Sequence, residues 1–121
     1  MQDPLMAALG MEGEIVSPGK ARVKATLRPE HLNSLNMAHG GFLYTLADSA
    51  FALASNSHGI PAVALATHME YLKPGTLGDN VEAIASEIHL GYRTGLYHVE
   101  IRRGDDLLAV FTGTVFRKQP K

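Results

Sequence analysis

The sequence predicts an α+β fold in which a single antiparallel sheet covers one long helix. Three observations carry this prediction. A loosely alternating segment from Met11 to Leu27 is interrupted by Pro18 and Gly19, which is the pattern of a hairpin with a tight turn. An apolar run from Phe42 to Ala54 has helical spacing. Four strand-like segments then follow Pro61, so the order is a hairpin, one helix and four strands.

Two helices are expected before the last four strands. Asp3, Pro4 and Gly10 have the order of an N-cap acid, a proline at the first helical position and a glycine after the end, which predicts a short helix. The run from Phe42 to Ala54 is apolar nearly all round, which predicts a buried helix. It should end near Asn56 to Gly59, where glycine is a natural C-cap.

The four later strands are separated by turn residues. Lys73-Pro74-Gly75 closes the first, Gly78-Asp79-Asn80 opens the second, and Gly104-Asp105-Asp106 joins the last two. The last three strands should therefore form an antiparallel meander. The expected strands are Val63–Leu72, Val81–Leu90, Tyr92–Arg102 and Leu107–Phe116.

Length and composition limit the function classes. The 121 residues fit one domain, residues 1–121, and the formal charge of −1 with scattered Lys and Arg argues against a nucleic-acid partner. Cysteine is absent, and the sequence offers neither a secretory signal nor ~20 consecutive apolar residues for a membrane span. We expect a soluble, cytoplasmic protein. Because 45% of so short a chain is hydrophobic, we also expect a homo-oligomer.

Asp48 is the most informative residue. It is the only Asp, Glu, Lys or Arg between Glu30 and Glu70, and it lies within the apolar run. Since an unpaired charge in an apolar setting costs several kcal/mol, a structural acid would normally have a cation nearby, and this segment has none. A functional role for Asp48 is the better interpretation.

Three further elements precede Asp48 within the same segment: Asn33, His39 and the pair Gly40-Gly41. The glycines stand where the helix begins, so their N–H groups are unpaired donors that a ligand can approach closely, as in an oxyanion pocket. Each element also has a structural interpretation, as a turn, a cap or a core residue. Asp48 follows Gly41 by about 11 Å along the axis, so it is better placed for a pocket of a second, antiparallel subunit.

These residues resemble the hotdog-fold acyl-CoA thioesterases of the phenylacetate-degradation PaaI type. The resemblance covers nearly the whole chain and is carried by Leu32-Asn33, His39-Gly40-Gly41, the segment 46–59, the segment Met69 to Gly75 and Phe111-Thr112-Gly113. It implies one long helix wrapped by an antiparallel sheet of about five to six strands. It also implies paired subunits with active sites at their interface, and a homotetramer built as a dimer of dimers.

The resemblance implies a role for each site residue. Asp48 matches the general base or nucleophile, and the N–H of Gly40 or Gly41 from the other subunit matches the donor to the thioester carbonyl. Asn33 matches a residue that helps position the water or the carboxylate, and His39 a histidine that orients the loop and contacts the thioester region. Where human-type relatives have a serine, this sequence has Ala64, and Thr67 is a weak substitute. Candidate substrate-binding residues are Tyr44, Thr45 and Leu53 for the acyl group and Arg93, with Lys73 or Arg117, for the CoA phosphates.

Thioester hydrolysis needs a base, an oxyanion donor and a dry pocket, so no cofactor or metal is expected. No two histidines have metal-site spacing, and no Gly-x-Ser-x-Gly motif is present. Two alternatives stay open. A non-catalytic acyl-CoA-binding or regulatory module would have the same pocket but would not need Asp48, and a hotdog dehydratase or hydratase would carry a different acid/base pair.

Overall fold

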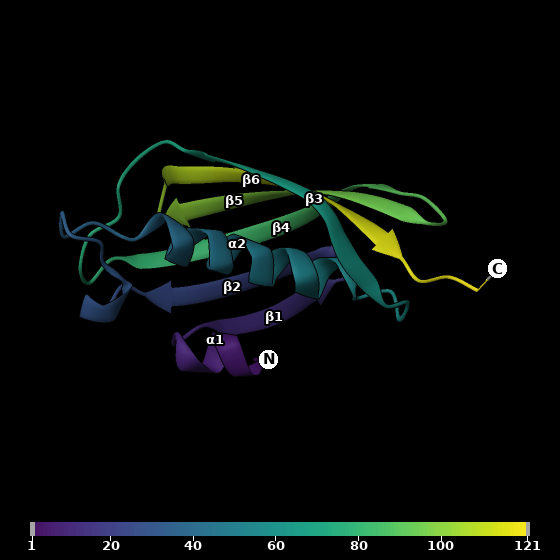
Figure 1. Cartoon of the computed structure of the whole chain (residues 1–121), viewed down its shortest axis with the longest axis horizontal. Coiled ribbons are helices and arrows are strands. Elements are labelled where there is room, and N and C mark those ends of the chain that lie inside the picture. Colours follow the sequence, from purple (N-terminus) through teal and green to yellow (C-terminus); the bar gives the residue numbers. More distant parts are fainter. Residues whose placement is uncertain (1, 121) are drawn as a thin grey trace.

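The computed structural model describes residues 2–120 and contains one six-stranded antiparallel sheet with a long helix, α2, lying along one face (Figure 1). The strand order is β1-β2-β4-β5-β6-β3. The elements are α1 (Pro4–Ala8), β1 (Glu12–Ser17), β2 (Lys20–Thr26), a 3-10 turn η1 (Pro29–His31), α2 (Gly40–Ser55), β3 (Ala62–Tyr71), β4 (Asn80–Leu90), β5 (Thr94–Arg103) and β6 (Asp106–Arg117).

The sequence-based elements are confirmed with small shifts at their ends. Asp3 caps α1 by accepting the Met6 N–H at 2.8 Å, and Gly10 follows the helix with φ of 72°. The hairpin of β1 and β2 turns through Pro18 and Gly19, where φ of 81° favours glycine. Strands β4, β5 and β6 form the expected meander. The fold class, α+β with one sheet on one helix, is therefore confirmed.

The core lies between α2 and the sheet. Phe51 of α2 packs edge-on against Tyr97 of β5 and tilted against Phe111 of β6, with ring centroids 5.8 and 5.3 Å apart. Small residues such as Ala83 and Ala85 of β4 are fully buried beneath the helix and let it approach the sheet closely. This packing fixes the position of α2, and with it the position of every candidate residue that the helix carries.

The prediction that α2 is buried nearly all round is wrong for one stripe of its surface. Gly41, Asp48 and Ala52 are exposed and Thr45 is half-buried, and their spacing of three to four residues places them on one side of the helix. The sheet covers the opposite side of α2. One sheet of this size covers only one face of the helix. Asp48 is therefore not enclosed by its own chain.

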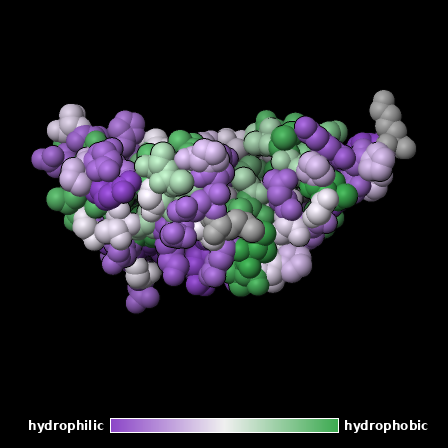
Figure 2. Space-filling view, turned by 90° about the horizontal axis from the view of Figure 1, so that it is seen from below, coloured by the Kyte–Doolittle hydropathy of each residue, from purple (hydrophilic) through white to green (hydrophobic). Residues whose placement is uncertain are grey.

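The two edges of the sheet differ. The β1 edge is short, carries Glu12 and Glu14, and has α1 beside it; Figure 2 views this side, where polar and apolar surface alternate. The β3 edge is ten residues long and has no charged residue before His68. Its Leu65 is 60% exposed and its Val63 46% exposed. A long, apolar edge strand of this kind is a template for pairing with another chain.

No helix within residues 2–120 is long and apolar enough to cross a membrane.

Candidate active site

The start of α2 offers one backbone donor that the chain itself does not use. His39 is the N-cap residue, and its Nδ1 accepts the Gly41 N–H at 2.9 Å. The next donors, Phe42 N–H and Leu43 N–H, bond to the His39 carbonyl at 2.9 and 3.2 Å. Within residues 2–120 no acceptor takes the Gly40 N–H. Of the two glycines that the sequence left as alternatives, Gly40 therefore has the free donor, whereas the Gly41 N–H is occupied.

The bond from Gly41 also sets the state of the His39 ring. Because Nδ1 accepts a hydrogen bond, neutral His39 carries its proton on Nε2. The backbone of His39 is held in turn, since its N–H donates to the His31 carbonyl at 2.8 Å. His31 is buried and stacks on Phe42 with ring centroids 3.9 Å apart. His39 is thus fixed as the cap that shapes the first turn of α2.

Asn33 faces the same end of the helix from the loop before it. Its side-chain oxygen accepts the N–H groups of Leu35 and Met37 at 2.9 and 3.1 Å, which orients the amide. The amide nitrogen makes no hydrogen bond within the described residues. Asn33 and Gly40 line one hollow of about 400 Å³, together with Met37, Ala38, Leu43, Tyr71, Leu72, Lys73 and Pro74.

Asp48 lies two turns further along α2 and does not line that hollow. Its carboxylate has no hydrogen bond or ion pair within residues 2–120. Partial desolvation by the surrounding atoms raises the pKa of Asp48 above its usual value, and the negative charge of Asp3 raises it further. The structure thus brings Asn33, His39 and Gly40 together at one end of α2, and leaves Asp48 of the same chain apart from them.

The predicted acyl-binding residues are divided between the two halves of α2. Tyr44 forms a hydroxyl–hydroxyl hydrogen bond with Thr67 of β3, so Thr67 is not free to replace a missing serine. Thr45 donates its hydroxyl to the Gly41 carbonyl at 2.8 Å and lies on the uncovered stripe. Leu53 lines a second, mostly apolar hollow of about 380 Å³ beside the end of the helix, which α1 and Ile15 of β1 also line.

The predicted phosphate-binding cations lie apart from one another. Arg93 is in the turn between β4 and β5, over the Tyr92 ring at 5.4 Å, at the end of the sheet where α2 ends. Arg117 is buried and donates to the Gly91 carbonyl at 2.8 Å, so it is not the exposed surface cation that the phosphate prediction assumed. Lys73 lines the hollow at Gly40 and pairs with Asp106 at 3.2 Å.

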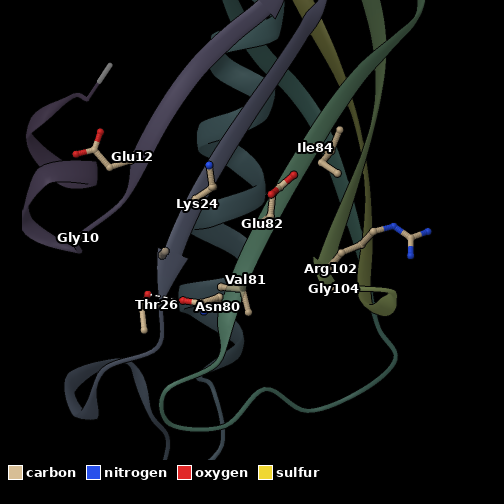
Figure 3. A pocket seen from close by; sticks show the side chains of 11 residues that line it. Gly10, Glu12, Lys24, Thr26, Asn80, Val81, Glu82, Ile84, Arg102 and Gly104 are labelled. Carbon is tan, nitrogen blue, oxygen red and sulfur yellow. Dashed lines mark hydrogen bonds between the residues drawn. The ribbon is translucent and has the colours of Figure 1, made fainter.

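A larger hollow, of about 560 Å³, lies on the outer face of the sheet and contains none of the predicted site residues (Figure 3). Two of its charged groups are paired within the chain, Glu82 with Arg22 at 3.1 Å and Arg102 with Glu100 at 2.8 Å. At its rim, the Thr26 hydroxyl donates a hydrogen bond to the side-chain oxygen of Asn80. Size alone does not make it the functional site.

Tyr71 is the residue that the sequence interpretation missed. Its hydroxyl donates to the Gly40 carbonyl at 3.0 Å, across 31 residues of sequence. Tyr71 stands at the end of β3, two residues before Lys73-Pro74-Gly75, and only the folding of β3 along α2 brings it to the helix start. The weak signal in the sequence was an aromatic residue at the end of a strand.

The chemistry available at this end of α2 is polarisation of a carbonyl. A free backbone N–H at a helix start and an amide donor face one hollow, where together they suit a developing negative charge on oxygen. The carboxylate that would act on the carbonyl carbon is present on α2, on the uncovered side. In one chain, the donors at the helix start and the Asp48 carboxylate therefore lie apart.

Comparisons with known proteins agree with this chemistry. Residues 35–110 match the Thioesterase superfamily. A relative from Archaeoglobus fulgidus is 43% identical over 100 residues, which are 82% of this chain but only 65% of that longer protein. The acyl-coenzyme A thioesterase PaaI of Escherichia coli is 40% identical over 116 residues, which are 95% of this chain and 83% of that protein.

Solved structures share the fold over almost the whole chain. The structure of PaaI from Escherichia coli superposes with a TM-score of 0.94 and 38% identity, covering 99% of this chain and 88% of that one. The TT0310 protein from Thermus thermophilus superposes with a TM-score of 0.92 and 54% identity, covering 97% and 99% of the two chains. The six-stranded sheet around one helix is the hotdog fold. The chain belongs to the thioesterase superfamily, and it is a thioester hydrolase of the PaaI type.

Proposed function

We propose that this protein hydrolyses acyl-CoA thioesters to a free acid and CoA, in sites that two copies of the chain build together. The observation that carries the proposal is the separation of Asp48 from the donor at Gly40 on one helix, with Asp48 on a stripe that the chain leaves uncovered. The name of the Escherichia coli relative, an acyl-coenzyme A thioesterase, supports the substrate class. Residues 1–121 act as a single hotdog domain.

The geometry of one chain supports a specific pairing. The Tyr44–Thr67 hydrogen bond places Tyr44 of α2 level with Thr67 on the open edge of β3. If two β3 strands pair antiparallel about a two-fold axis near Thr67, the two α2 helices run antiparallel beside each other. Gly41 and Asp48 lie about 5 Å to either side of that level, at ~1.5 Å per residue. The axis therefore brings Asp48 level with the helix start, Gly40-Gly41, of the second copy.

In the paired site the hydrolysis divides into named roles. The Gly40 N–H and the Asn33 amide hold the thioester carbonyl oxygen and stabilise its negative charge as the tetrahedral intermediate forms. His39 keeps the helix start in the required shape. Asp48 from the other copy either takes a proton from the water that attacks the carbonyl carbon, or attacks that carbon itself and forms an anhydride that water then opens. In both cases the C–S bond breaks, and the CoA thiolate leaves and takes up a proton.

The acyl group is an aryl-acetyl or a medium-chain group. Tyr44 and Thr45 lie between the two halves of the paired site, and the apolar hollow at Leu53 begins at Ser49, directly after Asp48, so together they offer a wall for such a group. Arg93 lies at the end of β3 that an antiparallel partner brings towards its own Gly40, where it is placed to meet a CoA phosphate. A substrate panel compared by kcat/KM identifies the acyl group.

The test is thiol release from acyl-CoA by the parent and by Asp48→Asn. We expect the variant to fold and assemble like the parent while kcat falls by roughly 10²-fold or more, the scale lost when a general base is removed. The matched control is Asp105→Asn, which changes an exposed acid in the turn between β5 and β6 and should leave kcat unchanged. An Asp48→Asn enzyme that hydrolyses its best substrate at the parent rate would favour the binding-module alternative.

A further inference from the structure

The peptide group that joins Gly40 to Gly41, at the start of α2, forms a hydrogen bond to a side chain at each of its two ends. On one end the Gly41 N–H donates to His39 Nδ1 at 2.9 Å. On the other end the Gly40 carbonyl accepts the hydroxyl of Tyr71 at 3.0 Å. His39 comes from the residue before the helix, whereas Tyr71 comes from the far end of β3, so the two restraints are independent.

This peptide needs such restraints because it joins two glycines. Glycine has no Cβ to limit its backbone angles, so a helix start made of two glycines has more freedom than any other pair of residues would have. The preceding peptide is fixed at its His39 carbonyl by Phe42 and Leu43. The bond from the Tyr71 hydroxyl to the Gly40 carbonyl adds a restraint on the other side of the Gly40 Cα.

The ring of Tyr71 adds a close contact at the same place. A Cβ built on Gly40 would lie 3.4 Å from the Tyr71 Cζ and hydroxyl, so the aromatic edge lies directly against this glycine. Tyr71 also lines the hollow that holds Gly40 and Asn33. Partial desolvation, followed by the nearby Tyr44, raises the pKa of Tyr71, so its hydroxyl keeps the proton that it donates.

We propose that Tyr71 is a positioning residue for the hydrolysis: its hydroxyl holds the Gly40 carbonyl, so that Gly40 is restrained on both sides of its Cα and its free N–H, in the preceding His39–Gly40 peptide, stays aimed at the thioester carbonyl. This inference rests on the proposed function, in which the Gly40 N–H is the carbonyl donor. Tyr71 acts through the backbone of Gly40 and does not itself bond the reacting atoms. Its effect should therefore appear in the chemical step more than in substrate binding.

The test compares Tyr71→Phe with the parent, since phenylalanine keeps the ring against Gly40 and removes only the hydroxyl. We expect kcat to fall roughly fivefold to tenfold, the range of one neutral hydrogen bond, while KM stays within about twofold. The matched control is Tyr92→Phe, because Tyr92 also donates its hydroxyl to a backbone carbonyl, that of Pro120 at 2.9 Å, away from Gly40. This control should leave kcat and KM unchanged.

A spectroscopic readout separates positioning from a general loss of structure. The probe is a ketone analogue of acyl-CoA in which a methylene replaces the sulfur and the carbonyl carbon is ¹³C. In the parent, the infrared carbonyl stretch of the bound ketone should lie at lower frequency than in Tyr71→Phe, because the aligned N–H polarises it more strongly. Both proteins should have equal melting temperatures and the same mass by light scattering.

The outcomes distinguish the two proposals. A parent that does not hydrolyse acyl-CoA contradicts the proposed function. A parent that is active, with Tyr71→Phe equal to it in kcat and in the carbonyl frequency, overturns the role of Tyr71 and leaves the proposed function standing. A fall in kcat accompanied by a lower melting temperature and an unchanged carbonyl frequency also overturns it, because the hydroxyl would then be structural.

Discussion

At the scale of single residues, the unusual feature is an acid without a partner on an otherwise apolar helix. Asp48 has no cation or hydrogen-bond donor within residues 2–120, and partial desolvation and the charge of Asp3 raise its pKa. Raising the pKa of a carboxylate costs stability at neutral pH, because the charged form is disfavoured in the folded protein. The same shift brings the proton affinity of Asp48 closer to what a base near neutral pH needs.

The pH dependence of hydrolysis should report this shift. The acid limb of kcat/KM is expected at a pH above the ordinary aspartate pKa, since activity needs ionised Asp48. Asp3→Asn removes the neighbouring charge but keeps a side-chain oxygen to cap α1. The pKa of Asp48 should then fall, and the acid limb should move to lower pH.

The control for this measurement is Asp105→Asn, which removes one acid far from α2 and should not move the limb. An acid limb that stays in place in Asp3→Asn, with α1 intact by circular dichroism, would show that Asp3 does not influence the catalytic base.

At the scale of elements, a half-buried polar cluster joins the C-terminal end of α2 to the sheet. Ser57 accepts the Gly19 N–H at 2.7 Å from the turn between β1 and β2. Glu87 of β4 accepts hydrogen bonds from His58 at 2.6 Å and from the fully buried Tyr97 of β5 at 2.9 Å. These bonds fix the end of α2 that lies opposite Gly40. They thereby keep the position of Asp48 along the length of β3 constant.

Glu87→Gln tests this fastening by equilibrium unfolding. Burial disfavours the charge of Glu87, but the hydrogen bonds from His58 and Tyr97 outweigh it and lower the pKa. Because the pKa of Glu87 is lowered in the folded protein, its ionised form stabilises the fold above the unfolded-state pKa. This stabilisation is lost as the pH falls through the folded-state pKa. We expect Glu87→Gln to lose about 1–3 kcal/mol at pH 7, with a smaller difference from the parent below pH ~4.

The comparison variant is Glu14→Gln, whose exposed pair with Arg22 should contribute at most ~1 kcal/mol. If Glu87→Gln were no less stable than Glu14→Gln at pH 7, the cluster would not be what fastens α2.

Local patterns were enough to predict the elements, because turns and caps are local. The Pro18-Gly19 turn, the Asp3 cap and the meander after Asn80 each follow from residues a few positions apart. Strand order was not predictable in this way: β3 leaves the helix and pairs with β6, the last strand, rather than with β4, the next one. This pairing joins residues as far apart in the sequence as Ala62 and Arg117, and it is what makes β3 an edge.

The candidate site could be predicted in part for the same reason. Asn33, His39 and Gly40 are close in sequence and meet at the start of α2. The contact of Tyr71 with Gly40 was missed because it depends on where β3 runs. The enclosure of Asp48 was predicted wrongly, because an apolar composition does not tell whether a helix face is covered by its own sheet or by a second chain.

At the scale of the whole molecule, two surfaces are open: the edge of β3, a strand that lies beside α2 (Figure 1), and the stripe of α2 that carries Asp48. Pairing two copies through β3 covers both at once, whereas pairing through β1 would leave both open. The outer face of the sheet, with its ion pairs at Arg22 and Arg102, is then available for a second contact between dimers. We therefore propose a homotetramer built as a dimer of dimers.

Light scattering at micromolar concentration tests the assembly and should give four times the mass of one chain. Leu65→Lys places a charge on the open β3 edge, where the parent side chain is 60% exposed in the single chain. This variant should lose the dimer and the activity together. A stable monomer of the parent that still hydrolyses acyl-CoA would contradict both the assembly and the shared site.

Complementation between two variants tests whether each site takes Gly40 from one chain and Asp48 from another. Asp48→Asn chains are mixed with Gly40→Val chains, whose added side chain should obstruct the hollow, after each variant has been shown to be folded and nearly inactive alone. In a mixed dimer, one site receives both defects and the other receives none. We predict that activity returns, at no more than about half the parent value per mixed dimer. No recovery, with the mixed dimer verified by mass spectrometry, would contradict it.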